Sequence, residues 1–412
     1  MEFKKYKIKE IGDVVGGATP YTKKADNYDG DISWITPNDL SNHREVYINR
    51  GERNISEKGL KEIGNTLLPK GTVLFSSRAP IGYVAIADKE LCTNQGFKSI
   101  IPNPDKVSSE YLYYTLGFYK SYIEKQGSGT TFMEVSGSTM ENVELPFPSL
   151  DEQKRIAETL LSIDKKISLN YSINADLESM AKQLYDYWFV QFDFPDENGN
   201  PYKSSGGKMV YNSTLKRDIP AGWKVSSYSE EFDVKLGGTP STSEDSFWEN
   251  GTINWLNSGE VQYFPINSSE KKITESALNG SSTEFLPKGS VLISITRYLR
   301  VTILNIDACI NQSVAGFAET EFLKYPYTYF ALSAEVPRLM KLRTGAQQPH
   351  INKEIIEASP ILLPPERILR EYYASCYPII DTLFKKSEEI EELTHLRDSL
   401  LPMLMNGQVT VE

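Results

Sequence analysis

The sequence is poor in the residues that build metal centres, and it contains no long apolar run. Its 412 residues include only 3 cysteines and 3 histidines. Cys92, Cys309 and Cys376 lie far apart and form no metal-type pair, so we expect reduced, buried thiols. No apolar run reaches the roughly 18 residues of a membrane-spanning helix, and no signal-peptide pattern is present. We therefore expect a cytoplasmic protein.

Catalytic motifs and excess positive charge are also missing. The histidines do not cluster, and neither a His-Glu-x-x-His motif nor a Gly-rich phosphate loop ending in Gly-Lys-Ser/Thr is present. The Asn/Asp-Pro-Pro-Tyr/Phe motif of amino-methyltransferases is absent too. We expect no catalytic residue, metal ion or cofactor. The net charge of −11 argues against a free-standing, nonspecific DNA binder, but it permits local patches or a partner that supplies positive charge.

The chain consists of two copies of one unit. Short segments recur in the same order at an offset of about 220 residues, which is how an internal repeat is recognised. Each copy is predicted to be mixed α/β, with buried strands at 72–76 and 290–294 followed by strands at 83–87 and 301–304. Tyrosine-rich helices at 109–125 and 325–342 close the units, and their tyrosines are expected in the core. The matching segments are 16–20 with 237–240, 32–35 with 253–256, 68–74 with 286–292, and 92–95 with 309–312.

A long amphipathic helix follows each copy. The first, from Ser149 to Trp188, opens with a capping box, Ser149 to Glu152, and repeats apolar residues every seven positions. The C-terminal helix repeats this pattern, and its polar break at Lys386 corresponds to Asn174. Pro378 should kink this second helix or delay its start. The predicted contact positions are Ile156, Leu160, Ile163, Ile167, Asn170, Asn174, Leu177, Ala181, Leu184 and Trp188, and Tyr372, Ile379, Lys386, Leu393 and Leu400.

The predicted fold class is α/β (α+β): two similar globular domains joined by two long helices that form an antiparallel coiled coil. The expected boundaries are 1–148, 149–190, 191–364 with a polar connector at 196–218, and 365–412. A helix of that length spans about 58 Å, so the domains would lie at opposite ends of one rod. An approximate two-fold axis would pass near Asn170, Asn174 and Lys386, where buried polar residues could fix the helix register.

Matched polar loops in both copies are the candidate binding residues. Arginine suits guanine, asparagine and glutamine suit adenine, and hydroxyl groups suit phosphates. Two such units would read two short DNA half-sites separated by a fixed gap. The candidates are Asn38, Ser76, Ser77, Arg78, Asn94, Gln95, Ser128 and Thr130 in the first copy, and Asn257, Ser294, Arg297, Tyr298, Asn311, Gln312, Gln347, Gln348 and His350 in the second.

These features resemble the specificity subunit of type I restriction–modification enzymes. The resemblance rests on Leu-Pro at 145–146 with Glu-Gln-Lys-Arg-Ile at 152–156, Tyr-x-x-Trp-Phe at 185–189, Pro-x-Gly-Trp at 220–223, Gly-Ala-Gln-Gln at 345–348, Leu-Pro-Pro at 363–365 and Leu-Arg-Asp-Ser-Leu-Leu-Pro at 396–402. It implies two target recognition domains on a helical spacer. It also implies double-stranded DNA, two methyltransferase subunits that use S-adenosylmethionine on adenine, and restriction subunits that use ATP and Mg²⁺. The implied docking residues are Arg155, Ile156, Ile167, Asn174, Trp188, Arg367, Ile379, Lys386, Leu393 and Leu400.

Three alternatives remain open at the level of sequence. The chain could be the recognition subunit of a fused restriction–methylation system, or a two-headed scaffold that binds proteins or glycans without DNA. A hydrolase built on Asp and Glu pairs is disfavoured because no local catalytic spacing is present. Salt-dependent, sequence-selective binding to duplex DNA would separate the scaffold from the two recognition subunits.

Overall fold

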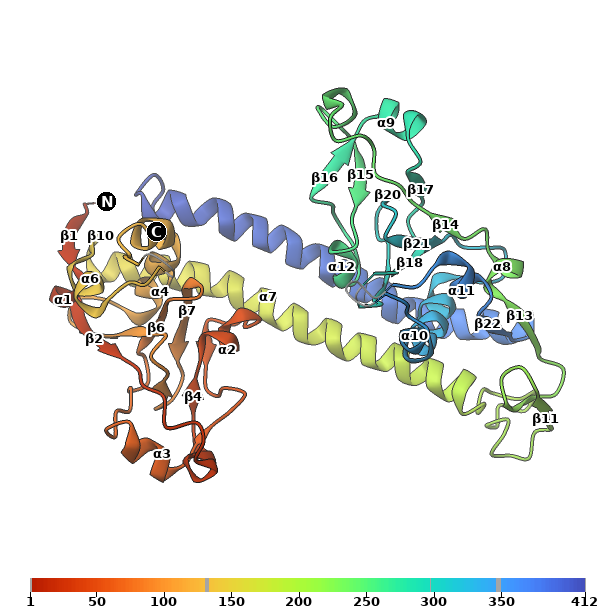
Figure 1. Ribbon diagram of the computed structural model, residues 1–412, viewed down its shortest axis with the longest axis horizontal. Coiled ribbons are helices and arrows are strands. Elements are labelled where there is room, and N and C mark those ends of the chain that lie inside the picture. The colour runs from red at the N-terminus through yellow and green to blue at the C-terminus, as the bar shows by residue number, and fades with distance from the viewer. Residues whose placement is uncertain (1, 130–132, 297, 346–349, 412) are drawn as a thin grey trace. The chain divides into compact units, whose positions relative to one another are not determined.

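The chain folds into two compact units that share two long helices (Figure 1). The computed structural model describes residues 2–129, 133–296, 298–345 and 350–411. Unit 1 comprises Met1–Asn170 and Glu389–Glu412, and unit 2 comprises Tyr171–Glu388. Helices α7 (Leu150–Tyr185) and α12 (Glu366–Met405) each contribute to both units. Among the described residues, no helix is both long and apolar enough to cross a membrane.

The globular part of unit 1 is built on a five-stranded sheet in the order β2-β9-β6-β7-β5. Its strands are antiparallel except for β5, which runs parallel to β7. Two strand pairs flank this sheet: β1 with β10, antiparallel, and β4 with β8, parallel. The strands are β1 (Lys4–Lys7), β2 (Gly12–Gly16), β3 (Tyr28–Ile32), β4 (Trp34–Ile35), β5 (Tyr47–Ile48), β6 (Val73–Ser77), β7 (Ile81–Ala87), β8 (Cys92–Thr93), β9 (Lys98–Pro102) and β10 (Glu144–Phe147), and the helices are α1 (Ile8–Ile11), η1 (Ala25–Asn27), α2 (Pro37–Ser41), α3 (Glu57–Glu62), α4 (Ser109–Phe118), α5 (Lys120–Glu124) and α6 (Gly137–Asn142).

The globular part of unit 2 contains two four-stranded sheets, β14-β21-β18-β19 and β16-β15-β20-β17. A β11–β12 hairpin and the β13–β22 pair complete it. The strands are β11 (Met209–Asn212), β12 (Arg217–Pro220), β13 (Lys224–Ser227), β14 (Lys235–Leu236), β15 (Ile253–Leu256), β16 (Lys271–Ile273), β17 (Glu284–Leu286), β18 (Val291–Ser294), β19 (Val301–Ile303), β20 (Ala308–Ile310), β21 (Val314–Phe317) and β22 (Pro360–Leu363), and the helices are η2 (Asp186–Val190), α8 (Tyr228–Glu231), η3 (Asp245–Phe247), η4 (Glu260–Gln262), α9 (Glu275–Gly280), α10 (Tyr325–Lys341) and α11 (Lys353–Glu357).

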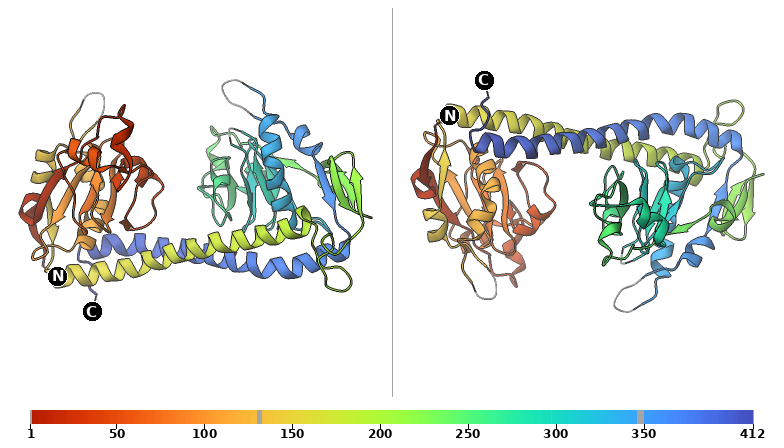
Figure 2. Two further views of the ribbon diagram at one scale, coloured as in Figure 1. Left: turned by 90° about the horizontal axis from the view of Figure 1, so that it is seen from below. Right: turned by 90° about the horizontal axis from the view of Figure 1, so that it is seen from above.

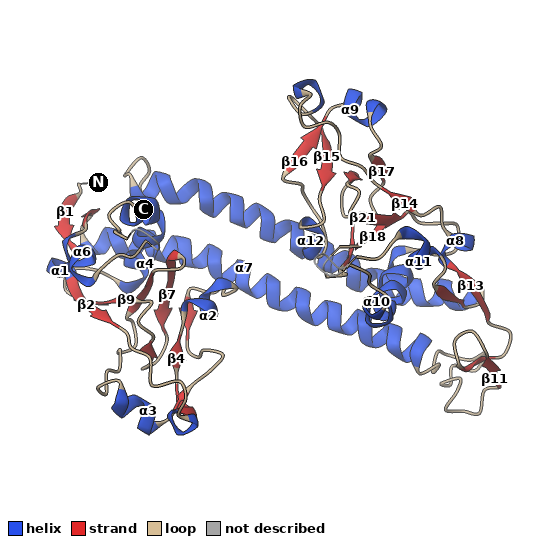
Figure 3. Ribbon diagram, in the orientation of Figure 1, coloured by secondary structure: helices blue, strands red, loops and turns tan. Residues whose placement is uncertain are grey.

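The internal repeat is confirmed by matching strand pairs. Both globular parts combine short strands with helices (Figure 3). In unit 1, Trp34 pairs with Cys92 in the parallel β4–β8 ladder, and in unit 2 Trp255 pairs with Cys309 in the parallel β15–β20 ladder. Each indole donates to a backbone carbonyl 3.1 Å away, that of Ala18 in unit 1 and that of Gly238 in unit 2. The predicted fold class, two mixed α/β domains with a pair of long helices, is therefore confirmed.

The tyrosine-rich helices pack into the core, as their pattern predicted. Tyr111 of α4 and Tyr327 of α10 are almost completely buried. The predicted helix at 109–125 is in fact two helices, α4 and α5, which meet at Tyr119. Helix α10 accommodates Pro337 inside its length. Tyr111 and Tyr327 therefore stabilise their units, whereas Tyr122 of α5 is 44% exposed.

Helix α7 follows the predicted capping box, and α12 extends from Glu366 through Pro378 to Met405. The capping box at α7 is present, since the Ser149 backbone N–H donates to Glu152 and the Glu152 N–H donates to the Ser149 hydroxyl. The Ser149 hydroxyl bond lowers the pKa of Glu152. Of the two effects expected of Pro378, a kink or a delayed start, the delayed start does not occur, because α12 begins at Glu366. Pro378 is exposed, and Ile380 and Leu383 just beyond it are buried in unit 2, so this packing offsets the backbone hydrogen bond that proline cannot make.

Within each unit, α7 and α12 lie side by side and run antiparallel (Figure 2). In unit 1, Ile163 and Ile167 of α7 cluster with Ile390 of α12, and Lys166 forms an ion pair with Glu389. In unit 2, Trp188, just beyond α7, packs its ring against Tyr372, with ring centroids 5.8 Å apart. The apolar residues predicted from the seven-residue repeat therefore hold the two helices together.

Candidate nucleic-acid interface

The polar loops of unit 1 gather at one end of its strands through backbone hydrogen bonds. Asn94 N–H donates to the Ile35 carbonyl over 3.0 Å, which joins the loops that follow β8 and β4. Ser77 N–H donates to Gly96 over 2.7 Å, and Val135 N–H donates to Ser77 over 3.0 Å. Loops from distant parts of the sequence thus form one polar surface, called here the loop cluster of unit 1.

Unit 2 builds its loop cluster with the same set of bonds. Asn311 N–H donates to Leu256 over 3.0 Å, Ile295 N–H to Ser313 over 2.9 Å, and Ile351 N–H to Ile295 over 3.0 Å. The equivalent bonds follow the β4–β8 and β15–β20 pairs, which are both parallel. The two copies therefore present corresponding loops in corresponding positions.

Three serines among the predicted DNA contacts are buried, so their hydroxyl groups are not placed to contact DNA. The Ser76 hydroxyl donates to the Pro80 carbonyl and accepts from the Tyr83 N–H, and the Ser77 hydroxyl donates to Gly96. In unit 2 the Ser294 hydroxyl donates to the Tyr298 carbonyl. All three side chains are almost inaccessible to solvent. Ser76 and Ser294 hold the turns after β6 and β18, and Ser77 binds the loop that follows β8.

Three asparagines shape the loops with their side chains. The Oδ1 atoms of Asn94, Asn257 and Asn311 each accept the backbone N–H two residues on, at 2.7–3.0 Å. This Asx turn is a common way for asparagine to fix a loop. A bidentate contact with adenine uses the amide oxygen as well as the amide nitrogen, so these asparagines are better suited to positioning their neighbours.

Other candidates remain accessible. The Arg78 side chain is 38% exposed, and its guanidinium lies 3.9 Å from Glu134, which Lys98 also contacts at 3.3 Å. Tyr298 is 68% exposed. Lys98 and Glu134 were not recognised from the sequence, because only the fold brings them beside Arg78. Asn38, Ser128 and His350 are exposed, whereas Thr130, Arg297, Gln347 and Gln348 lie outside the described residues.

A threonine–glutamine pair occurs at the same place in both clusters. In unit 1 the Thr19 hydroxyl donates to Oε1 of Gln95, and in unit 2 the Thr239 hydroxyl donates to Oε1 of Gln312 over 2.6 Å. Both glutamines are exposed. The sequence indicated the glutamines but not their partners, although the repeated Gly-Gly motif with its Thr-Pro marks both threonines.

Burial separates the predicted docking residues into three groups: buried, exposed and partly buried. Ile156, Ile167 and Trp188 are buried, so they stabilise the units and cannot meet a partner directly. The outward face of α7 instead carries Leu169 and Met180, which are 59% and 53% exposed. Among the remaining predicted positions, Arg155 and Arg367 are exposed, and Asn174, Ile379, Lys386, Leu393 and Leu400 are partly buried.

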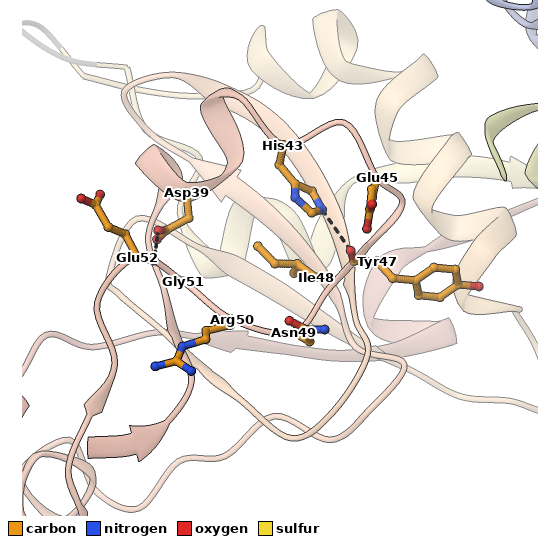
Figure 4. Close-up of a pocket in the computed structure, with 9 residues that line it drawn as sticks. All are labelled: Asp39, His43, Glu45, Tyr47, Ile48, Asn49, Arg50, Gly51 and Glu52. Carbon is orange, nitrogen blue, oxygen red and sulfur yellow. Dashed lines mark hydrogen bonds between the residues drawn. The ribbon is translucent and has the colours of Figure 1, made fainter. Parts of the chain in front are cut away.

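A polar pocket of about 470 Å³ lies beside α2 in unit 1 (Figure 4). Asp39 accepts backbone N–H groups from Thr36 at 2.7 Å and from Glu52 at 2.6 Å, and His43 donates from Nε2 to the Tyr47 carbonyl at 3.0 Å. These side chains hold the segment that follows α2. Over the described ranges, no group of three or more His, Cys, Asp or Glu residues is placed to hold a metal ion.

The cysteines near the loop clusters are held in their neutral form. Burial raises the pKa of Cys92 to about 12 and that of Cys309 to about 11. The Cys92 thiol donates weakly to the Ser33 carbonyl at 3.4 Å. A thiol with so high a pKa is a poor nucleophile at neutral pH, so these residues serve packing.

The chain is similar in sequence and fold to proteins of one known family. Residues 1–179 and 220–392 match the family of type I restriction modification DNA specificity domains. The chain is 36% identical to the specificity subunit of the type I restriction enzyme MjaIX of Methanocaldococcus jannaschii, over 98% of this chain and 93% of that protein. It is 23% identical to the HindI specificity subunit of Haemophilus influenzae, over 83% of this chain and 87% of that one. The crystal structure of the type I restriction–modification S subunit of M. genitalium shares the fold, with a TM-score of 0.61 and 17% identity over 98% of this chain and 96% of that one.

Proposed function

Because the chain belongs to the family of type I restriction–modification DNA specificity subunits, we propose that its two loop clusters read the two halves of one bipartite DNA target. The chain is the DNA specificity subunit of such a system, is not itself an enzyme and carries no cofactor of its own. The observation that best supports the proposal is the duplication of the loop cluster, with corresponding backbone bonds in both units. Two similar loop clusters on one chain are suited to a DNA target with two separate half-sites.

The assignment of domains follows from this proposal. Residues 1–148 and 191–364, with the connector 196–218, are the two target recognition domains. Residues 149–190 and 365–412 form the spacer whose length sets the gap between the half-sites. Since the DNA of the cell is in the cytoplasm, the protein is expected to act there.

Partner subunits supply the chemistry that this chain lacks. Two methyltransferase subunits dock on the spacer and its flanks and bring S-adenosylmethionine for adenine methylation. The exposed apolar residues Leu169 and Met180 of α7 are suitable contacts, because apolar side chains on an outward helix face favour burial by a partner. Restriction subunits that use ATP and Mg²⁺ join the same complex. The net charge of −11 makes partners that add positive charge useful for holding DNA.

The spacer proposal is tested by lengthening both helices. Seven residues inserted after Asn170 in α7 and after Glu388 in α12 add two helical turns, or about 10.5 Å. Methylation of a random duplex library by the complete methyltransferase complex should then report the same two half-sites with a gap longer by up to about 3 base pairs, at 3.4 Å per pair. A changed half-site sequence with an unchanged gap would contradict the proposal. An insertion in α7 alone is the control, because it puts the paired helices out of register.

The recognition proposal is tested with Arg78. Its replacement by alanine should relax discrimination in one half-site only, at a cost of about 1–3 kcal/mol if the contact is bidentate to guanine. Equal loss of discrimination at both half-sites would assign Arg78 to folding or assembly instead. Wild-type complexes that show no salt-dependent, sequence-selective binding to duplex DNA would favour a scaffold that binds other ligands.

A further inference from the structure

We propose that Gln95 and Gln312 contact DNA phosphates rather than bases, and that Thr19 and Thr239 are positioning residues that orient the two amides for this contact. The inference rests on the proposed function and gives the same role to one residue pair in each loop cluster. It departs from the general rule that glutamine in such loops reads adenine.

The hydrogen bond fixes which end of each amide faces the protein. A glutamine Oε1 can only accept, so the threonine hydroxyl is the donor in both pairs. The amide nitrogen, which can only donate, is left at the end of an exposed side chain. Bidentate pairing with adenine needs the oxygen and the nitrogen together, whereas a phosphate oxygen accepts from the nitrogen alone. Oε1 has a second lone pair, but the threonine bond turns the oxygen toward the protein, so the outward amide nitrogen suits a single acceptor such as a phosphate oxygen.

A glycine allows the loop that carries each threonine to lie close to the loop that carries its glutamine. A Cβ atom on Gly17 would lie 2.1 Å from the Asn94 carbonyl oxygen, and one on Gly237 would lie 1.9 Å from that of Ile310. Such distances are impossible for a real side chain, so only glycine permits this approach. The two loops are further joined by the Ala18 N–H, which donates to Thr93 over 2.9 Å. Each threonine is thus supported by backbone contacts on a rigid part of its unit.

Duplication of the pair also points to the DNA backbone. Two half-sites of different sequence share only their sugar–phosphate chains, so residues that are the same in both units suit the phosphates. By contrast, neighbouring positions differ between the units. The backbone β-bridge between Arg78 and Glu134 in unit 1 corresponds to the β-bridge between Thr296 and His350 in unit 2. Such differing positions are suited to base discrimination.

The test measures affinity and specificity separately in the complete methyltransferase complex. Gln95→Ala should weaken binding by about 10- to 150-fold, as expected for the loss of one hydrogen bond to a charged group. The factor should be the same for duplexes with a substituted base pair in either half-site. Gln312→Ala should behave in the same way. Thr19→Val, which removes only the hydroxyl, should weaken binding in the same uniform manner, and Thr19→Ser should restore it. Because Gln95 is exposed, its replacement should leave the melting temperature unchanged.

A chemical substitution in the DNA identifies the contacted group. A neutral methylphosphonate at the contacted phosphate should weaken the wild-type complex but not the Gln95→Ala complex. Relaxed discrimination at one base pair, with an unaltered methylphosphonate effect, would overturn the assignment and make Gln95 a base reader. Unchanged affinity in Gln95→Ala would also overturn it. Loss of sequence-selective binding in the wild type itself would instead refute the proposed function, and with it this inference.

Discussion

Arg397, Asp164 and Tyr114 connect three elements of unit 1, and the loss of Arg397 should be costly. The guanidinium of Arg397 on α12 lies 2.9 Å from Asp164 on α7, and the Tyr114 hydroxyl of α4 donates to the other oxygen of the same carboxylate over 2.5 Å. The Asp164 side chain is only 12% exposed. Removing one partner of a buried ion pair costs about 3–5 kcal/mol, because the other charge stays buried.

The expected loss for Arg397→Met is smaller, about 2–3 kcal/mol, because the Arg397 side chain is 30% exposed and Tyr114 still binds the carboxylate. Hydrogen exchange of unit 1 amides measures this loss separately from unit 2. Adding Asp164→Asn removes the uncompensated charge, so the double variant should lose at least about 1 kcal/mol less than the sum of the single losses. Additive losses would refute the reasoning. Arg367→Met is the matched control, since its exposed pair with Glu371 should contribute under about 0.5 kcal/mol.

Three further predictions concern packing, register and pH. Trp188→Ala should destabilise unit 2 by about 3–5 kcal/mol in denaturant melts, while Tyr187→Ala at the exposed neighbouring position should have little effect; similar losses would contradict the burial of Trp188. Asn174 has a buried Oδ1 without a hydrogen-bond partner in the described structure. Replacing both Asn174 and Lys386 with leucine should therefore raise the melting temperature but permit other assemblies. A single unchanged species in light scattering would argue against a role in fixing the helix register. Burial raises the pKa of Cys92 to about 12. The stability that its neutral thiol contributes is therefore fully present below the unfolded pKa of about 8.5 and declines as the pH rises above that value. A wild-type melting temperature that falls no more than that of Cys92→Ala between pH 8 and 10.5 would contradict this.

The internal repeat allowed the fold to be predicted from the sequence. Matching segments such as 68–74 and 286–292 predicted equivalent strands, and the seven-residue pattern predicted α7 and α12. Pro378 does not delay the start of α12, because tertiary packing around Ile380 offsets one missing hydrogen bond. The break at Tyr119 between α4 and α5 was also missed, although Gly117 near the end of α4 was a signal for it.

The candidate site was harder to predict than the fold. The sequence located the loops, but a serine at a strand end looks the same whether it is exposed or buried. Ser76 is buried only because β6 continues to Ser77 and the turn needs its hydroxyl. In the same way, the hydrogen bond between Thr19 and Gln95 forms only because two loops that are distant in the sequence lie close together in the folded chain.

The central claim is that this chain selects one two-part DNA target, and a methylation map of the host genome tests it most directly. The map is recorded in cells with the gene, without it, and with the gene restored. The account predicts that adenine methylation at one bipartite motif disappears with the gene and returns on restoration. A methylation pattern that is the same in all three strains, while the partner methyltransferase is present and active, would contradict the claim.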